Sequence, residues 1–243
     1  MGFTQTMLDR YSDEIKVATQ HPFLTAAGRL ELEADKLSEW LTQDRIYALC
    51  GYPKFIASLI CALPLSSTAA QRSSRELLSL FSFALANIAR EVGFFDSLGP
   101  RFNLDLNFVA PSASKLQGGL VNPTTKAYVD LLIATGAEAG KNGGLEEALV
   151  LLWGMEKIYL MAWTHAKSQH PPSSVREASP TVKALKDLIH NWTQPEFVEF
   201  VERIEIEVGA LGLQEGSEAW TRAEEMFKYN LLLEQKFWPN MNE

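Results

Sequence analysis

Asp44, Glu156 and Glu234 are carboxylates at positions where the helical spacing of apolar residues predicts hydrocarbon. Asp44, for example, lies four residues after Trp40 and three after Leu41, so it shares their side of a helix. A lone buried carboxylate costs on the order of several kcal/mol unless it is paired, hydrogen-bonded or protonated. Inward-facing acids whose pKa is raised in this way are candidate general acids and bases.

Tyrosines accompany these acids at helical spacing. Tyr47 lies three residues after Asp44, Tyr159 lies three after Glu156, and Tyr128 is on an inward stripe of its own helix. Two interpretations follow from the residues alone. Either each acid bonds a tyrosine, an arginine or the backbone inside an ordinary core, or the acids and tyrosines converge on a polar pocket in an apolar cavity. In the second case the aromatic rings would stack on a flat heterocycle.

The elements that position these side chains are predicted to be helices, because apolar residues recur at helical spacing and no alternating pattern exceeds four residues. The segment 145–167 is apolar on nearly all sides at 148–153, which is typical of a central, covered helix. The stretch 96–123 holds several glycines and prolines and is predicted as a long loop. Nothing marks a domain boundary, so we expect one all-α domain over residues 1–243. The predicted helices cover residues 5–18, 23–33, 35–63, 74–94, 124–136, 145–167, 180–191, 195–213 and 216–238.

The composition predicts a cytoplasmic or nuclear protein. A formal net charge of −8 and a pI of about 5.2 argue against nucleic acid and anionic membranes as main partners. The longest apolar run, 55–65, is interrupted by Pro64 and is too short to span a bilayer, and residues 1–20 have no signal-peptide core. With only two cysteines, a disulfide framework is not expected and a reducing compartment is the default.

A metal-dependent oxidase is a further alternative, because helical bundles also hold paired metal ions. Such sites usually need repeated Glu-x-x-His pairs. The four histidines are His21, His165, His170 and His190, and the last of them forms a lone three-residue pair with Asp187. We therefore expect no metal and no cofactor.

Five segments are similar in order and spacing to one known family. The sequence contains "HPFLTAAGRLELEADKLSEWLTQDRIYAL", "NPTTKAYVDLL", "ALVLLWGMEKIY", "PEFVEFVERIE" and "MFKYNLLLEQKFW". Together they resemble the TenA/THI-4 (thiaminase II) family over nearly the whole chain. The resemblance implies a heme-oxygenase-like multi-helical bundle, often assembled as a homotetramer, with a pocket for the aminopyrimidine part of thiamin.

The resemblance also implies roles for the acids and aromatic residues. Asp44 matches the acid that binds the pyrimidine ring, and Tyr47 and Tyr128 match pocket aromatics. Tyr159 matches the tyrosine that follows the family's nucleophile by four residues. Glu234 matches the acid that assists catalysis in the closing Glu-x-x-Phe-Trp signature.

Two positions depart from the family pattern. Trp192 stands in place of a pocket tyrosine, and Met155 stands where the family has its nucleophilic cysteine. A thioether cannot be deprotonated and cannot act as that nucleophile. Cys50 and Cys61 are on another predicted helix, and Cys50 is expected to point away from Asp44. The chain thus resembles divergent, eukaryotic-type members that lack the cysteine.

Three functions remain open. The first is a thiamin-salvage-type hydrolase of aminopyrimidines, in which Asp44 and Glu234 bind and protonate the ring while Glu156 or Glu234 activates water. The second is a binding protein for an aminopyrimidine or a related small heterocycle, without catalysis, and the third is the metal-dependent oxidase. We expect a homodimer or homotetramer. The remaining predicted ligand-binding residues are Tyr47, Tyr128, Met155, Tyr159 and Trp192.

Overall fold

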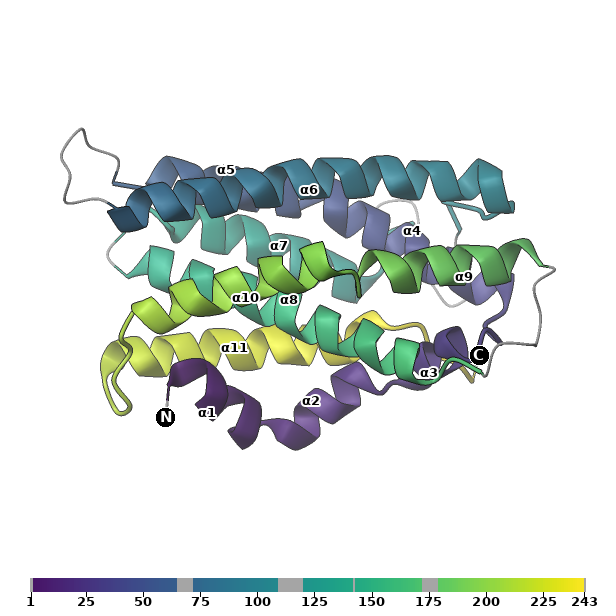
Figure 1. The fold of residues 1–243 in the computed structure, drawn as a ribbon. Helices are drawn as coiled ribbons and strands as arrows, with labels where there is room; N and C mark the ends of the chain where they lie inside the picture. Colours follow the sequence, from purple (N-terminus) through teal and green to yellow (C-terminus); the bar gives the residue numbers. More distant parts are fainter. Residues whose placement is uncertain (1, 65–71, 109–119, 142, 172–178, 243) are drawn as a thin grey trace.

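Eleven helices account for the regular structure of the described part of the chain (Figure 1). The computed structural model describes residues 2–64, 72–108, 120–141, 143–171 and 179–242. No strand occurs in these ranges, as the sequence predicts. The helices are α1 (Phe3–Arg10), α2 (Ser12–Thr19), α3 (Pro22–Gly28), α4 (Ala34–Cys50), α5 (Tyr52–Ala62), α6 (Arg72–Phe102), α7 (Pro123–Glu138), α8 (Gly144–Ser168), α9 (Pro180–Asn191), α10 (Pro195–Ala210) and α11 (Glu218–Phe237).

Helix α8 is the centre of the bundle, as its apolar sequence predicts. It packs against α11, α10, α3 and α2, and more lightly against α7, α9 and α5. Every residue from 148 to 156 is buried, so this helix has no solvent-facing side over more than two turns. Figure 1 shows α8 running obliquely through the bundle, crossing α10 and passing from the side of α7 to that of α3. A side chain on α8 can therefore reach a cavity from the middle of the molecule.

The prediction of one helix over 35–63 is wrong, because the chain breaks at Gly51. Helix α4 ends at Cys50 and α5 begins at Tyr52, with Pro53 in its first turn. Proline has no amide hydrogen to continue the ladder of α4. A Cβ at Gly51 would lie 2.9 Å from the Leu132 Cδ1 atom, so the glycine also lets α7 approach closely. The break turns Tyr52 inward, and only 4% of this residue is exposed.

The predicted helix end near residue 94 is also wrong. Helix α6 continues to Phe102, and the predicted loop 96–123 therefore begins as helix. Phe95, Leu98 and Phe102 repeat at spacings of three and four and are all buried, so packing maintains the helix. Pro100 is tolerated because it lies in the last turn. Residues 109–119 of that predicted loop lie outside the described ranges.

The predicted first and second helices differ from the observed ones at their ends. The segment 5–18 is two helices that bend at Tyr11, whose hydroxyl donates to Glu224 on α11 at 2.7 Å. The segment 23–33 ends as helix at Gly28, and Leu30 has a left-handed φ of 59°. His21 is the N-cap of α3, and its Nδ1 atom accepts a hydrogen bond from the Phe23 amide. The remaining predicted helices are confirmed within a few residues of their predicted ends.

Helix α6 is long and apolar enough, by length and composition alone, to cross a membrane over Ser74–Phe102. The sequence alone does not predict this helix as a membrane span. Only 22% of its most apolar 18-residue window is buried, and α6 packs against α4, α5, α9 and α10.

The close approach of α3 to α8 gives the first prediction. A Cβ at Gly28 would lie 2.0 Å from the carbonyl oxygen of Ala166, which is backbone and cannot rotate away. Gly28→Ala should therefore lower the free energy of unfolding by roughly 3 kcal/mol or more, measured by urea denaturation. In the matched control, a Cβ at Gly93 meets nothing within 4 Å, and Gly93→Ala should raise stability by roughly 0.5–1 kcal/mol. A Gly28→Ala protein as stable as the wild type would contradict the packing of α3 on α8.

Candidate functional site

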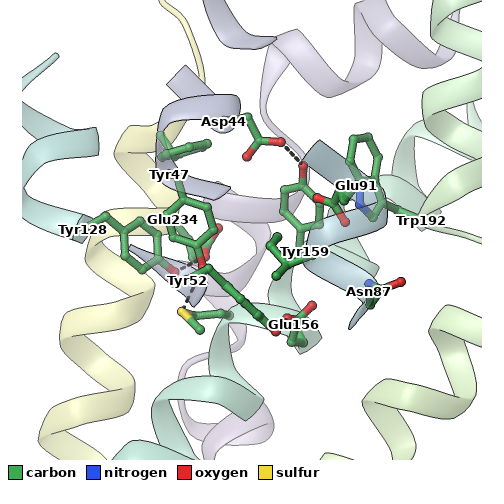
Figure 2. A pocket seen from close by; sticks show the side chains of 13 residues that line it. Asp44, Tyr47, Tyr52, Asn87, Glu91, Tyr128, Glu156, Tyr159, Trp192 and Glu234 are labelled. Atoms are coloured by element: carbon green, nitrogen blue, oxygen red, sulfur yellow. Dashed lines mark hydrogen bonds between the residues drawn. The ribbon is translucent and has the colours of Figure 1, made fainter. Parts of the chain in front are cut away.

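A cavity lies between α4, α5, α6, α7, α8 and α11, and Trp192 closes it from the residue after α9. About 540 Å³ of the space within it, part of which is open to solvent, is not filled by protein atoms. The cavity is lined by Asp44, Tyr47, Tyr52, Asn87, Ile88, Glu91, Tyr128, Met155, Glu156, Tyr159, Trp192, Glu234 and Phe237 (Figure 2).

All eight residues predicted as site residues line this one cavity. They come from five different segments, so the fold brings together side chains up to 190 positions apart, from Asp44 to Glu234. The functional roles assigned to them stay predictions. Five further lining residues were not predicted: Tyr52, Asn87, Ile88, Glu91 and Phe237.

Helix caps hold two of the contributing helices in place. Asn122 caps α7, with its side chain accepting from the Thr125 amide at 2.7 Å, and Pro123 occupies the first turn. The Gln43 side chain, next to Asp44 on α4, bonds both the Leu120 carbonyl and the Asn122 amide. The start of α7 is thereby tied to α4, which fixes Tyr128 relative to Asp44. Helix α11, which carries Glu234, is capped by Ser217.

Each of the three predicted acids is in hydrogen-bond contact with a tyrosine hydroxyl. Tyr159 donates to Asp44 at 2.9 Å, and Tyr52 donates to Glu156. Tyr128 lies between Glu234 and Asn230, in contact with both. Figure 2 shows these pairs pointing into the same space. The two interpretations left open by the sequence are therefore both partly right, since the acids bond tyrosines of the core and also line a cavity.

Tyr128 bridges Glu234 and Asn230. The hydroxyl has one hydrogen and contacts the Asn230 Oδ1 atom and a Glu234 carboxyl oxygen, both of which are acceptors when Glu234 is ionised. Both contacts are satisfied if Glu234 is protonated and donates to Tyr128, while Tyr128 donates to Asn230. Asn230 is fully buried and approaches Gly154, where a Cβ would lie 2.7 Å from the amide nitrogen. Asn230 thus positions Tyr128, although it does not line the cavity.

Met155 lies at the centre of the aromatic wall. Its sulfur accepts a hydrogen bond from the Tyr47 hydroxyl at 3.1 Å. The Tyr47 ring packs edge-on against Tyr128 at 5.0 Å and against Phe237 at 6.0 Å. Tyr159 and Trp192 form the other wall, with ring centroids 5.1 Å apart. A flat ligand would therefore lie between aromatic side chains and beside a thioether.

Glu91 on α6 is a fourth carboxyl in the cavity. It lies three residues after Ile88 and four before Phe95, both buried, which is the same inward spacing that identifies Asp44. The sequence therefore contains the pattern that would predict Glu91 as a site residue. None of the five segments that resemble the family includes α6, so Glu91 was not predicted. Figure 2 shows Glu91 beside Trp192, on the side of the cavity away from Tyr128. No described tyrosine hydroxyl bonds it, in contrast to the other three acids.

Burial raises the pKa of all four carboxyls. It raises the pKa of Asp44 to about 7, with the Tyr159 hydroxyl opposing the shift and Glu156 adding to it. It raises the pKa of Glu156 to about 7, opposed by Tyr52, and that of Glu234 to about 8, opposed by Tyr128 and increased by Asp44. Burial and the neighbouring Asp44 and Glu156 raise the pKa of Glu91 well above its usual value. Near neutral pH the cavity therefore holds both protonated and ionised acids.

No lysine, arginine or histidine occurs among the described residues that line the cavity. The acids thus face one another without a protein cation, and a ligand that supplies positive charge or N–H donors would relieve their repulsion. Within the described ranges, no group of three or more histidine, cysteine, aspartate or glutamate residues is placed to hold a metal ion. His165 bonds Thr25 instead, and Cys50 and Cys61 are exposed. Cys50 therefore points away from Asp44, as predicted.

The fold and the cavity together define an all-helical protein with an acidic, aromatic cavity at its centre. Among solved structures, the chain is similar to a TenA homologue from Pyrococcus furiosus, with 23% identity, a TM-score of 0.76 and coverage of 97% of this chain and 98% of that one. It is similar to a TenA homologue from P. horikoshii OT3, with 18% identity, a TM-score of 0.68 and coverage of 98% and 97%. A candidate TenA-like thiaminase from Sulfolobus solfataricus P2 has 12% identity, a TM-score of 0.63 and coverage of 98% and 94%. The expected all-α, multi-helical bundle is therefore confirmed.

A fungal relative adds a different name. The chain is 25% identical over 231 residues to a "Probable transcription factor" from Fusarium pseudograminearum (strain CS3096). The match covers 83% of this chain and 43% of the relative, so the chain spans less than half of that protein's length. No family model matches the chain.

The raised carboxyl pKa values predict an unusual dependence of stability on pH. A group whose pKa is higher in the folded state stabilises the fold fully below its unfolded pKa, near 4, and loses that contribution as pH rises through its folded pKa. For Asp44, Glu156 and Glu234 this loss runs up to about pH 7–8. The thermal midpoint should therefore fall between pH 5 and pH 8.5. Glu234→Gln should reduce the fall by on the order of 2 kcal/mol, or roughly 4–8 °C.

Glu225→Gln, on the exposed side of the same helix, is the matched control and should leave the pH dependence as in the wild type. Differential scanning calorimetry across this pH range measures both variants. A midpoint that is flat or rises from pH 5 to pH 8.5 would show that the cavity acids titrate normally.

Proposed function

We propose that the chain is a member of the TenA/THI-4 (thiaminase II) family and that it hydrolyses an aminopyrimidine. The observation that supports this most directly is the cavity in which four carboxyls meet aromatic walls without a described cationic side chain. A ligand there has to bring N–H donors or positive charge and a flat surface. An aminopyrimidine brings a basic ring nitrogen, an exocyclic amine and an aromatic ring.

The binding roles follow from the positions of the hydrogen-bonding groups. Asp44 is the proposed acceptor for the protonated ring, and its bond to Tyr159 fixes the orientation of the carboxyl. Tyr47, Tyr128 and Trp192 are the proposed stacking surfaces. Two N–H bonds to one carboxylate are stronger and more directional than a single neutral bond, which favours an amidine-like edge over a simple alcohol.

The proposed reaction exchanges an amine for a hydroxyl group at the carbon attached to the ring. An aminomethyl-pyrimidine and water give a hydroxymethyl-pyrimidine and ammonia. The water oxygen bonds to the carbon as the carbon–nitrogen bond breaks, one water proton goes to a carboxylate, and the leaving amine takes a proton from a carboxylic acid. Glu156 is the proposed base and Glu234 the proposed acid, because pKa values of about 7 and about 8 suit both transfers near neutral pH.

A second function, binding without catalysis, is favoured by one specific observation. Met155 occupies the position that the resemblance assigns to the nucleophile, and a thioether cannot form a thiolate. A chain that had kept the pocket for storage or delivery of the heterocycle would retain the stacking residues and Asp44. Turnover by the wild-type protein separates the two functions.

The remaining proposals concern partners and location. We expect a homo-oligomer, as in the resembled family, and a cytoplasmic protein. The fungal relative's name raises DNA binding as a possibility for that longer protein. For this chain the net charge of −8 and the acidic cavity favour a small, cationic or amine-bearing molecule over nucleic acid.

Removal of the proposed acid tests the enzyme function. Wild-type protein should release ammonia from 4-amino-5-aminomethyl-2-methylpyrimidine, and Glu234→Gln should reduce kcat by about 10²–10⁴ because the amide cannot exchange a proton. Glu225→Gln is the matched control and should keep wild-type activity. If the wild-type protein binds this pyrimidine in calorimetry but releases no ammonia, the binding function holds instead. If no binding occurs, the family assignment of the pocket fails.

Met155→Cys tests whether the cavity still accommodates thiol catalysis. The new thiol would lie close to the Tyr47 hydroxyl, which contacts the Met155 sulfur in the wild type. We expect the variant to raise kcat for the same pyrimidine at least tenfold and to become sensitive to alkylation by iodoacetamide. The wild type is the control, because its exposed Cys50 and Cys61 react without reaching the cavity. A variant that binds the pyrimidine but shows neither change would mean that position 155 is not aligned with the reacting carbon.

A further inference from the structure

Asn230 is a buried polar residue behind the wall of the cavity. It lies on α11, one helical turn before Glu234, and its side chain is fully buried without lining the cavity. Its Oδ1 atom accepts a hydrogen bond from the Tyr128 hydroxyl, which also contacts a carboxyl oxygen of Glu234. Figure 2 shows Tyr128 and Glu234 together on one side of the cavity. Asn230 therefore reaches the proposed acid through Tyr128.

Gly154 provides the space for the Asn230 amide. The glycine lies in the interior of α8, within the fully buried stretch 148–156. A Cβ at Gly154 would lie 2.7 Å from the Asn230 Nδ2 atom and 3.4 Å from the Phe227 Cδ2 atom. Glycine destabilises the interior of a helix relative to alanine, because it loses more conformational freedom on folding. The central helix thus gives up some stability at the position that leaves room for this amide.

The Nδ2 atom of Asn230 has no hydrogen-bond partner in the part of the chain that the structure describes. A buried amide with one unused end is unusual in a folded protein. The oxygen and nitrogen ends of an amide are nearly equal in size. Half a turn of the amide would therefore fit the same space, break no bond to Nδ2 and present an N–H donor to Tyr128.

Each orientation of the amide matches one protonation state of Glu234. With Oδ1 toward Tyr128, the hydroxyl donates to Asn230 and accepts from a protonated Glu234. With Nδ2 toward Tyr128, Asn230 donates to the hydroxyl, and the hydroxyl donates to an ionised Glu234. Both contacts of Tyr128 are thereby satisfied before and after Glu234 loses its proton.

We infer that Asn230 is a positioning residue that turns its amide when Glu234 gives up or regains a proton, and so reverses the hydrogen bonds of Tyr128. The inference rests on the proposed function, in which Glu234 is the acid. When Glu234 protonates the leaving amine, the Tyr128 hydroxyl turns toward the new carboxylate and Asn230 donates to Tyr128 in its place. No proton passes along this chain, because the O–H bond of Tyr128 and the N–H bonds of Asn230 stay intact.

Other groups also act on Glu234, but none of them bonds Asn230 in the described ranges. Asp44 on α4 and Glu156 on α8 raise the pKa of Glu234, and Glu234 in turn raises the pKa of Tyr47 on α4. Helices α1 and α2 also pack against α11, and their acidic and basic side chains are exposed: Asp9, Arg10, Asp13, Glu14 and Lys16. The hydrogen-bonded route from Glu234 to Asn230 therefore runs through the Tyr128 hydroxyl.

The test is a pH titration of the ligand-free protein by NMR, which does not depend on catalysis. The side-chain amide of Asn230 is followed by 15N labelling and identified by its loss in Asn230→Leu. The carboxyl of Glu234 is followed by 13C labelling and identified by its loss in Glu234→Gln. One Asn230 N–H signal should move downfield with the same midpoint as the Glu234 carboxyl, because it becomes a donor to Tyr128. The exposed Asn240 amide is the internal control and should not move.

Tyr128→Phe separates hydrogen bonding from the electric field of the carboxylate. The variant removes one oxygen and leaves Glu234 free to titrate, so the Asn230 signal should lose its pH dependence. An Asn230 signal that does not follow Glu234 in the wild type, or that follows it equally in a folded Tyr128→Phe protein, would overturn the inference. Thermal midpoints show whether each variant is folded, and the wild-type titration decides if Tyr128→Phe is not.

Steady-state kinetics connects Asn230 to the proposed reaction. Asn230→Leu should lower kcat for 4-amino-5-aminomethyl-2-methylpyrimidine roughly three- to tenfold, the value of one net hydrogen bond, and leave KM nearly unchanged. A variant with the wild-type kcat would overturn the positioning role. If the wild-type protein releases no ammonia, the proposed reaction fails, while the NMR titration still decides whether the amide of Asn230 turns with Glu234.

Discussion

The structure depends on burying four carboxyl groups together, with no cationic side chain among the described residues around them. Three of these groups are stabilised by tyrosine hydroxyls, in the pairs Asp44–Tyr159, Glu156–Tyr52 and Glu234–Tyr128. A hydroxyl is a weaker partner than an arginine, so it opposes only part of the rise in carboxyl pKa that burial causes. An arginine in the same place would form an ion pair and remove the acid from proton-transfer chemistry. The choice of partner thus keeps the acids available for a ligand.

This constraint explains why so many helices meet at one place. A tyrosine–carboxyl pair fixes two helices relative to each other, and the three pairs join α4 to α8, α5 to α8 and α7 to α11. Two of the pairs include α8, which has no solvent-facing side where it carries Glu156. The break at Gly51 is part of the same arrangement, because a continuous helix would extend α4 past the point at which Tyr52 turns toward Glu156. The cavity is therefore built by the contacts that hold the bundle together.

The sequence predicts those features of this arrangement that depend on residues three or four positions apart. Helical periodicity gave the all-α class, the central position of α8 and the inward direction of Asp44 and Glu234, because each depends only on neighbours three or four positions away. It missed the break at Gly51, although glycine and Pro53 are a local signal for it, and it missed the extension of α6 to Phe102, where tertiary packing overrides the local effect of Gly99 and Pro100. The inward position of Glu91 could have been predicted from its spacing. The pairing of Tyr52 with Glu156 could not, because it depends on how two helices cross.

Met155 shows why the acids carry the chemistry in the proposed reaction. A thiol at this position would attack carbon directly, and the surrounding carboxyls would only have to move protons. With a thioether there, water is the remaining nucleophile, and it needs a base on one side of the carbon and an acid on the other. A cavity with a single carboxyl cannot provide both at one pH. Four coupled carboxyls with raised pKa values can, because partial protonation of the group leaves some members ionised and others neutral over the same pH range.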